Sequence, residues 1–344
     1  MKPWLILLVM MLLSRFGHAQ DASFSSIDWN VQNIEAKTPD SLAQLLTRNH
    51  TTELAKVRAI YSWITNHIAY NMDIFRRNPG PYKYSPDPLD TSAVWPSGDE
   101  MIARKVLRKR VAVCDGYSRL FKVMCSYAGI EAEIVQGYGR VNGGGDKKFR
   151  TNHTWNAVRI DSAWKLLDIT WASGYTTYAD DFVQKQNDFY FLTPPDQFIT
   201  DHYPEELRWT LLANPPAPYE LKKLPFRSKN FFKYGVNSYF PQSGIIEAAE
   251  GDTILFSVQL KDVARAKTTS ADPFMDTLSY SQWPLSSFVK AGRENGNFVY
   301  YSYVAEPAAE WINLLYNDDV IMRYRINVSI KKEAVNTVSL LSPN

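Results

Sequence analysis

The 344-residue chain has few of the residues that bind metals or form disulfides, with two cysteines and five histidines in all. None of them lies beyond Pro225, which excludes thiol and imidazole chemistry from the C-terminal part of the chain. The sequence also has no metal-ligand cluster, phosphate-binding loop, internal repeat or low-complexity tract. We therefore expect neither a cofactor nor a metal.

Nor does the chain carry an excess of charge of one sign, because 38 lysines and arginines face 36 acids and the formal net charge is +2. A strongly basic field is typical of proteins that bind nucleic acid, so we expect no such partner. One basic cluster precedes the first cysteine, and we interpret it as a solvated helix face that could also help to keep a nearby thiolate charged. It consists of Arg104, Lys105, Arg108, Lys109 and Arg110.

The apolar run near the N-terminus is too short to span a bilayer, which takes about 20 residues. It extends from Trp4 to Leu13, after Lys2 and before the small-x-small pattern Gly17-His18-Ala19. A charge, an apolar run and small residues in this order are typical of an export signal, and a buried N-terminal helix is the alternative. We expect residues 1–19 to be a cleaved signal peptide and the protein to be periplasmic or secreted, with no membrane span. Its removal leaves the chain without net charge.

The pattern of the chain changes from about Pro225 onward. Short runs such as "DTILFSVQL", "NFVYYSYVA" and "VIMRYRINVSI" alternate with a period of two and are separated by turn residues. Such spacing predicts a β-sandwich, in whose core we place Tyr300, Tyr301 and Tyr303. The chain is long enough for two domains, and we predict them at residues 20–222 and 223–344.

Two helices are predicted before the first cysteine, over "TPDSLAQLLTRN" and "TTELAKVRAIYSWITNHIAY". The apolar stripe of the second helix predicts that one face packs on a core. Residues 71–97 contain five prolines, and we expect a long irregular loop that lines a cleft. A short helix from about Asp99 to Leu107 then leads to the first cysteine.

Cys114 and Cys125 lie eleven residues apart in the stretch "CDGYSRLFKVMCSYAG". On one helix a rise of about 1.5 Å per residue separates them by roughly 16 Å, whereas a disulfide needs Cα atoms within about 7 Å. We therefore predict no disulfide. Cys114 begins a helix that runs to Ala128 and stops at Gly129, and the helix start stabilises a thiolate. Cys125 lies deeper on the same face and is interpreted as a small core hydrophobe.

A strand over residues 131–139, a glycine-rich loop and a hairpin over residues 153–170 follow. With a two-residue turn at Asp161-Ser162, Trp155 faces Asp168 across the hairpin. His153 and Asp168 are then diagonal neighbours on one face, at about 7 to 8 Å between Cα atoms, which suits a hydrogen bond between imidazole and carboxylate.

Cys114, His153 and Asp168 are thus the candidate nucleophile, base and orienting acid. The alternatives are a structural role for His153 and a turn or cap role for Asp168.

Three blocks of the chain, "VCDGYSRLFKVMCSYAGIEAEIVQGYG", "NHTWNAVRI" and "AWKLLDITW", resemble those of the transglutaminase-like superfamily. The wording "CDGYSRLF" and "DITW" is similar to the kyphoscoliosis peptidase-like branch. The resemblance covers about residues 51–175, with a weaker likeness in "YFLTPPDQFITDHYPEELRW". It implies an α+β fold with a papain-like, transglutaminase-like core before the β-sandwich, in which Cys114, His153 and Asp168 match the catalytic triad.

The resemblance also implies a reaction in which Cys114 attacks an amide carbonyl, His153 protonates the leaving amine and a thioester forms. We expect an exported, cysteine-dependent hydrolase of the peptidase or amidase kind, with a peptide or protein substrate. A transglutaminase and a non-catalytic binding scaffold are the alternatives. The second oxyanion donor is unassigned, since the indole N–H groups of Trp63 and Trp95 are each expected to pack.

Overall fold

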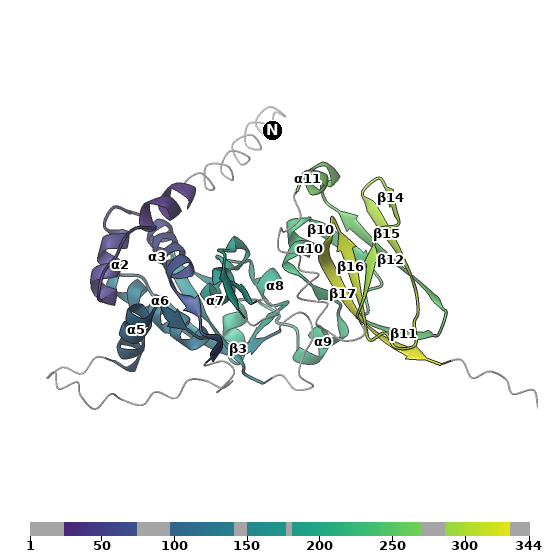
Figure 1. Cartoon of the computed structure of the whole chain (residues 1–344), viewed down its shortest axis with the longest axis horizontal. Helices are drawn as coiled ribbons and strands as arrows, with labels where there is room; N and C mark the ends of the chain where they lie inside the picture. The colour runs from purple at the N-terminus through teal and green to yellow at the C-terminus, as the bar shows by residue number, and fades with distance from the viewer. Residues whose placement is uncertain (1–23, 74–96, 141–149, 177–180, 270–285, 331–344) are drawn as a thin grey trace, which may run out of the picture. The chain divides into compact units, whose positions relative to one another are not determined.

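The computed structural model describes residues 24–73, 97–140, 150–176, 181–269 and 286–330, and these form two units with separate hydrophobic cores (Figure 1). We call the described residues up to Pro215 the N-terminal unit and those from Pro216 the C-terminal unit. The predicted signal peptide, the glycine-rich loop and Trp95, with most of the proline-rich segment, lie outside the described residues. No helix within the described ranges is both long and apolar enough to cross a membrane.

The N-terminal unit is built around helix α6, which contacts four helices and two strands of the sheet. The helices of this unit are 24–31, α2 (Pro39–Thr47), α3 (Glu53–His67), α5 (Gly98–Lys109), α6 (Cys114–Tyr127), α7 (Ile169–Ser173) and α8 (Pro195–Phe198). Two 3-10 turns, η2 (Asp188–Tyr190) and η3 (Leu207–Thr210), lie in the same unit. Because α6 lies at the centre, its first residue is held from several sides.

The ends of α5 and α6 follow local sequence signals. Ser97 caps α5 by accepting a hydrogen bond from the Glu100 N–H at 3.2 Å, and the helix is one or two residues longer at each end than predicted. At the end of α6, Gly129 has a φ of 73° and the Ile130 N–H donates to the Cys125 carbonyl at 2.9 Å. This left-handed glycine termination confirms the predicted stop of the helix.

Helix α3 was expected to bury one face, and this prediction is wrong because residues 57–65 are buried on all sides. Even the Arg58 side chain is only 1% exposed. Its guanidinium donates to Asp28 at 2.8 Å and to Asp188 at 2.9 Å, so two carboxylates from distant segments compensate the buried charge. The periodicity of apolar residues could not show this, because the covering segments come from elsewhere in the chain.

A four-stranded antiparallel sheet in the order β5-β4-β3-β8 forms the other half of the N-terminal unit. Its strands are β3 (Ala132–Gly139), β4 (His153–Ile160), β5 (Ala163–Leu167) and β8 (His202–Pro204). Two short ladders accompany it, the parallel β1 (Ala69–Tyr70) with β2 (Val111–Ala112) and the antiparallel β6 (Gly174–Thr176) with β7 (Phe182–Gln184). Helices and an antiparallel sheet in one unit confirm the α+β class.

The β4–β5 hairpin turns at Asp161 and Ser162, whose φ angles of 48° and 66° are those of a tight two-residue turn. The predicted turn and register are confirmed as far as the pair Asn156↔Leu167. The predicted pairing of Trp155 with Asp168 is wrong, because β5 ends at Leu167 and Asp168 caps α7. The backbone N–H of Asp168 donates instead to the Tyr190 carbonyl at 3.0 Å. Aspartate is a strong N-cap residue, so β5 ends one residue before the predicted pair.

The C-terminal unit contains two sheets whose buried side chains form one core, as expected for a β-sandwich. One sheet has the order β10-β12-β15-β14 and the other β11-β17-β16-β13, with β9 beside β17. The strands are β9 (Phe226–Arg227), β10 (Val236–Phe240), β11 (Ile245–Ala249), β12 (Thr253–Leu260), β13 (Ser286–Lys290), β14 (Arg293–Asn295), β15 (Phe298–Val304), β16 (Trp311–Tyr316) and β17 (Asp319–Ser329). Helices α9 (Pro218–Lys223), α10 (Lys229–Lys233) and α11 (Val263–Thr268) belong to the same unit.

Strand β15 shows the expected period-two alternation of buried and exposed residues. Tyr301 and Tyr303 lie in the core, where 2% and 8% of their surface is exposed. The placement of Tyr300 in the core is wrong, since it is 39% exposed. Successive side chains of a strand point to opposite faces, so placing both Tyr300 and its neighbour Tyr301 in the core was incompatible with the alternation itself.

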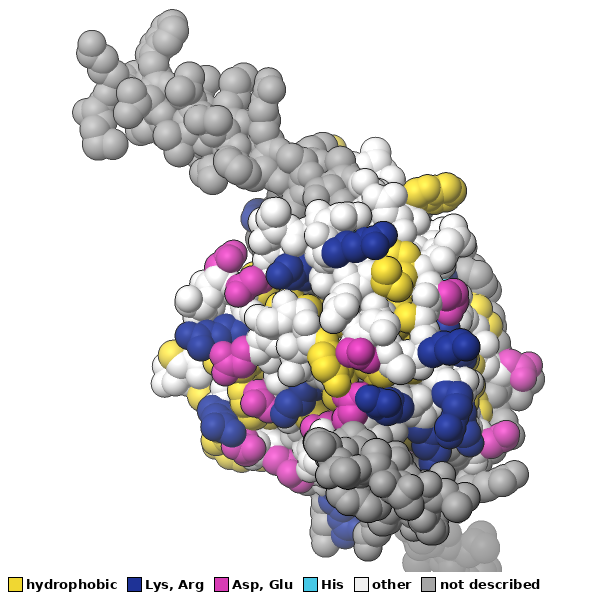
Figure 2. Space-filling view, turned by 90° about the vertical axis from the view of Figure 1, so that its left-hand side faces the viewer, with side chains coloured by type: hydrophobic (Ala, Val, Ile, Leu, Met, Phe, Trp, Pro, Cys, Tyr) yellow, Lys and Arg dark blue, Asp and Glu magenta, His cyan; other side chains and the backbone are white. Residues whose placement is uncertain are grey.

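The predicted basic cluster lies on α5 and at its end. Arg104 pairs with Glu100 at 2.8 Å, and Arg110 pairs with Glu35. On the face of the molecule in Figure 2, lysine and arginine side chains lie among aspartates and glutamates. The solvated helix face is therefore the better interpretation of the cluster.

Contacts divide the chain between Pro215 and Pro216, whereas the sequence places a domain boundary between residues 222 and 223. Helix α9 favours the earlier division, because the Gly244 N–H donates to the Lys223 carbonyl at 2.6 Å. Independent folding of the two domains remains a prediction.

We predict that limited proteolysis cuts within residues 212–217, which form neither helix nor strand, and that the fragment ending at Pro215 unfolds cooperatively. The reason is that the two cores share no residue. Mass mapping of the cuts and circular dichroism on heating test this. A fragment ending at Thr193, which lacks β8, serves as the control that should not fold. An insoluble or non-cooperative fragment 1–215 would show that the two parts share one core.

Candidate active site

Cys114 is the first residue of α6 and is partly exposed, whereas Cys125 is fully buried. Both cysteines are free, as predicted. The cap residue of α6 is Val113, whose side chain has no hydrogen-bonding group. The positive end of the helix dipole thus acts on the thiol without competition from a capping side chain. Cys114 therefore has the surroundings of a reactive cysteine, and Cys125 those of a core residue.

His153 begins β4 beside the thiol, and its position is fixed by the preceding residue. The Asn152 side chain accepts from the Gly139 N–H at 2.7 Å and donates to the Gly139 carbonyl at 3.2 Å, extending the ladder between β3 and β4. The His153 ring Nε2 lies 2.6 Å from Asp168 Oδ2. The Cys114 thiol lies close enough to the ring for each group to shift the pKa of the other.

Two glycines of β3 make room for this arrangement. A Cβ on Gly139 would lie 3.0 Å from the Cβ of His153, and a Cβ on Gly137 would lie 2.4 Å from the Trp155 ring and 2.3 Å from the Tyr203 carbonyl. The two glycines alternate with Tyr138, so they leave the same face of β3 bare. Side chains from both neighbouring strands can therefore reach across it.

The Asp168 carboxylate is fully buried and accepts three hydrogen bonds. Its Oδ2 atom lies 2.6 Å from His153 Nε2 and 2.8 Å from His202 Nε2, and its Oδ1 atom accepts from the Trp171 N–H at 3.1 Å. The sequence offered two roles for Asp168, a helix cap and the partner of His153. Asp168 fills both roles. The structure brings Cys114, His153 and Asp168 together.

His202 is a site residue that sequence reasoning missed. It lies 34 residues beyond Asp168 and reaches the site because β8 pairs with β3, with Gly139 opposite His202. Its Nδ1 atom lies 2.6 Å from Asp201 Oδ1. The only available signal was an aspartate-histidine pair inside the weaker block of the family resemblance.

The charges of the site favour a thiolate and an imidazolium. Burial on its own would lower the pKa of His153, but the charge of Asp168 and hydrogen bonds to Asp168 and Cys114 raise it to about 10. Burial would raise the pKa of the Cys114 thiol, but hydrogen bonds to His153 and Thr154 and the charge of His153 lower it. Burial would also raise the pKa of Asp168, which the two histidines hold well below its usual range. At a pH between the pKa of the Cys114 thiol and the pKa of His153, both groups are charged.

His153, Asp168 and His202 bring three possible metal-ligand atoms within 4.8 Å of one another. Their nitrogen-to-oxygen separations of 2.6 and 2.8 Å are hydrogen-bond distances. A tetrahedral Zn²⁺ site with ligands about 2.0–2.2 Å from the ion requires wider spacing. The three residues fit a hydrogen-bonded array and do not fit a metal.

Trp63, one of the indoles considered as an oxyanion donor, is fully buried and donates to the Ile34 carbonyl at 2.8 Å. Its packing role is confirmed. Trp95 lies outside the described residues.

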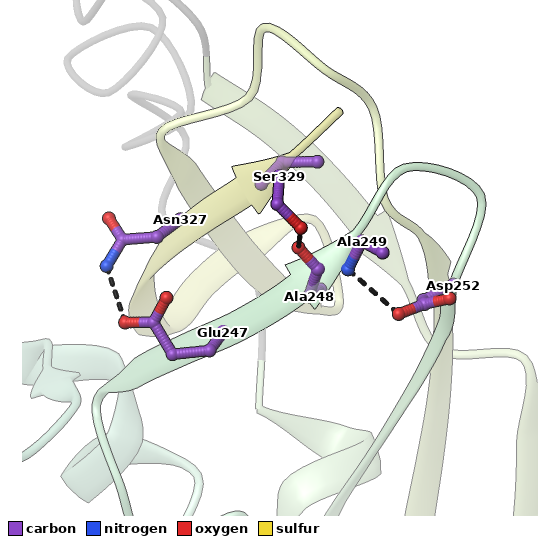
Figure 3. Close-up of a pocket in the computed structure, with 7 residues that line it drawn as sticks. Glu247, Ala248, Ala249, Asp252, Asn327 and Ser329 are labelled. Atoms are coloured by element: carbon purple, nitrogen blue, oxygen red, sulfur yellow. Dashed lines mark hydrogen bonds between the residues drawn. The ribbon is translucent and has the colours of Figure 1, made fainter. Parts of the chain in front are cut away.

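The C-terminal unit has a hollow of about 450 Å³ that is lined by residues of the paired strands β11 and β17 and by Asp252 (Figure 3). Its polar groups already bond to one another, since Asn327 donates to Glu247 at 2.6 Å and the Ala249 N–H donates to Asp252 at 2.8 Å. No cysteine or histidine occurs in this part of the sequence. The candidate active site therefore belongs to the N-terminal unit.

Residues 40–169 match the sequence profile of the transglutaminase-like superfamily. The matched range contains α6, β4 and the start of α7, and hence Cys114, His153 and Asp168. The chain thus contains a transglutaminase-like superfamily domain, as its sequence motifs predicted.

Curated relatives agree with this assignment. The chain is 32% identical to the human kyphoscoliosis peptidase over 233 residues, which cover 66% of this chain and 32% of that protein. It is 30% identical to hillarin of Drosophila melanogaster, over 60% of this chain and 25% of that protein. The chain therefore spans about a third or less of the length of these relatives. A solved structure of a TGase is 18% identical with a TM-score of 0.28, covering 52% of this chain and 41% of that one.

We predict that iodoacetamide labels Cys114 and spares Cys125 in the folded protein, with a midpoint below the ordinary thiol pKa of about 8.5. The sign follows from His153, whose positive charge favours the thiolate as the pH falls below its own pKa of about 10. His153→Asn should move the midpoint upward, and His50→Asn is the matched control. Peptide mapping across a pH series gives the rates. Preferential labelling of Cys125, or an unchanged midpoint in His153→Asn, would contradict the assignment.

Proposed function

We propose that the protein is an exported, cysteine-dependent hydrolase of the peptidase or amidase kind that acts on peptide amides. The observation that supports this most is the grouping of three residues. Cys114 lies at a helix start, His153 lowers the pKa of its thiol, and His153 Nε2 lies 2.6 Å from Asp168 Oδ2. A partly exposed cysteine with a lowered pKa has the properties of a nucleophile. The kinship with a protein called kyphoscoliosis peptidase supports the same class.

In the proposed reaction the Cys114 thiolate attacks the amide carbonyl carbon and a C–S bond forms. The oxyanion is stabilised by first-turn N–H groups of α6. His153, as the imidazolium, protonates the leaving amine as the C–N bond breaks, which leaves a thioester and a neutral imidazole. The neutral His153 then takes a proton from water, whose oxygen attacks the thioester and releases the acid and the Cys114 thiolate.

The three residues also imply a pH range. Attack needs the Cys114 thiolate, so activity falls as the pH drops through the lowered thiol pKa. Departure of the amine needs protonated His153, so activity falls again as the pH rises through about 10. The proposed hydrolase therefore works best between these two limits.

We predict that the thioester is resolved by water and not by an amine. An amine competes with water only if the protein binds and orients it, and such positioning can be worth several kcal/mol. Incubation of a peptide library with a labelled primary amine separates the two products by mass. Cys114→Ala should abolish both, Asp168→Asn should lower kcat by about 10⁴-fold, as loss of the orienting acid does in a serine triad, and Cys125→Ala should retain activity.

Amine-linked products that depend on Cys114 would make the protein a transglutaminase instead. The absence of either product, with Cys114→Ala still retaining a peptide ligand, would favour a binding scaffold.

We also predict that the protein is exported, on the strength of the charged, apolar and small-residue order in residues 1–19. Expression of the full chain in a bacterial host should yield a protein outside the cytoplasm that begins at Gln20. Mass measurement of the intact protein and cell fractionation test this. Replacement of Leu7 and Leu8 by arginine should keep the protein inside and uncleaved. An uncleaved wild-type chain in the cytoplasm would refute export.

A further inference from the structure

The proposed mechanism leaves unused a histidine that touches the same carboxylate oxygen as His153. His202 is 1% exposed and begins β8. Its Nε2 atom lies 2.8 Å from Asp168 Oδ2, and its Nδ1 atom lies 2.6 Å from Asp201 Oδ1. Both ring nitrogens thus face carboxylate oxygens.

This geometry determines the proton count of His202. An ionised carboxylate only accepts hydrogen bonds, and a neutral imidazole carries one N–H. Two short contacts to carboxylates therefore require both nitrogens to be protonated. Burial alone would lower the pKa of His202, but Asp201 and Asp168 raise it. The ring is accordingly a buried cation between two anions.

We propose that His202 is a positioning residue of the candidate site, an imidazolium that keeps Asp168 ionised and holds its Oδ2 atom toward His153. This inference rests on the proposed use of Asp168 as the orienting acid. Asp168 receives one donor from α7 and one from each of two histidines on different strands. Without His202, the carboxylate loses a charged donor and becomes easier to protonate.

The surroundings of His202 contain few other charges. Phe198 stacks on the ring at 4.1 Å between centroids, and the Trp171 ring lies 4.4 Å away. Among the described residues, the titratable or charged groups around the ring are Asp168, Asp201, His153, Tyr190 and Arg140. The Tyr190 hydroxyl donates to the Asp201 carboxylate at 3.2 Å, and the backbone N–H of Arg140 donates to the Asp201 backbone carbonyl at 2.7 Å. His202→Phe would keep the aromatic packing against Phe198 and Trp171 but would leave Asp168 and Asp201 without the donors of this ring.

The test compares the pH dependence of Cys114 alkylation in the full chain and in His202→Phe, which keeps the ring and removes both donors. His202→Phe removes a positive charge from the array around the thiolate, so the thiol becomes easier to protonate and the acid limb of alkylation should move to higher pH. We expect a shift of about one pH unit, the lower end of the 1–3 units by which a nearby charge moves a pKa. Alkylation on the acid limb should then be about tenfold slower.

His202→Gln, which keeps one neutral donor, should shift the limb less than His202→Phe, and His50→Phe is the control that should not shift it. A lower melting temperature with an unmoved limb in His202→Phe would assign His202 a structural role and overturn the proposal. Should that variant not fold, ¹⁵N NMR of histidine-labelled wild-type protein decides, with resonances assigned from His202→Gln. Protonation of both His202 nitrogens at pH 7 is expected, and a neutral ring would overturn the proposal.

Iodoacetamide requires no substrate, so this test is separate from that of the hydrolase. A shifted limb without hydrolysis of any peptide would retain the role of His202 and reject the proposed reaction. Peptide hydrolysis by the wild-type protein, with no shift of the acid limb of alkylation in His202→Phe, would support the proposed reaction and reject the role of His202.

Discussion

The buried carboxylate of Asp168 ties together three segments of the N-terminal unit that are distant in sequence. It receives hydrogen bonds from His153 on β4, from His202 on β8 and from the Trp171 N–H on α7. Removing one partner of a buried charge typically costs about 3–5 kcal/mol, because the remaining charge is left uncompensated. The position of each segment is therefore coupled to the charge of one side chain, and the two histidines share that charge.

The strand between the histidines contributes by having no side chains on one face. Gly137 and Gly139 of β3 lie opposite His153 and His202 respectively, and a Cβ on either would collide with the array or its support. Glycine normally weakens a strand. Here the absence of side chains permits the imidazoles of His153 and His202 to approach the Asp168 carboxylate from the two strands that flank β3. Helix α6 brings Cys114 to the same site from the helical layer.

The C-terminal unit follows simpler rules. Alternation along β15 divides its residues between the core and the surface, so Tyr301 is buried and Tyr300 is not. The directions of the strands are less regular. β11 runs parallel to β17 and β13 runs parallel to β16, whereas β16 and β17 are antiparallel. Periodicity within a strand indicates which face is buried, but it contains no information about the direction of the neighbouring strand.

Local signals in the sequence by themselves determined the helix start at Cys114, its stop at Gly129, the turn at Asp161-Ser162 and the burial of Cys125. These features depend on residues within a few positions of each other, through caps, backbone angles and helical periodicity. The grouping of Cys114, His153 and Asp168 was also predicted, because three motifs in order resemble one family.

Only the tertiary structure decided how Asp168 is held. The hairpin register brought it near His153, but its N-cap geometry depends on the backbone bond to Tyr190 and on α7. His202 enters through a strand pairing 34 residues further along the chain, a contact that no spacing rule in the sequence encodes. Hydrogen bonds between distant segments depend on how the whole core packs, so the sequence determined the local elements, whereas the contact of the second histidine followed from the tertiary structure.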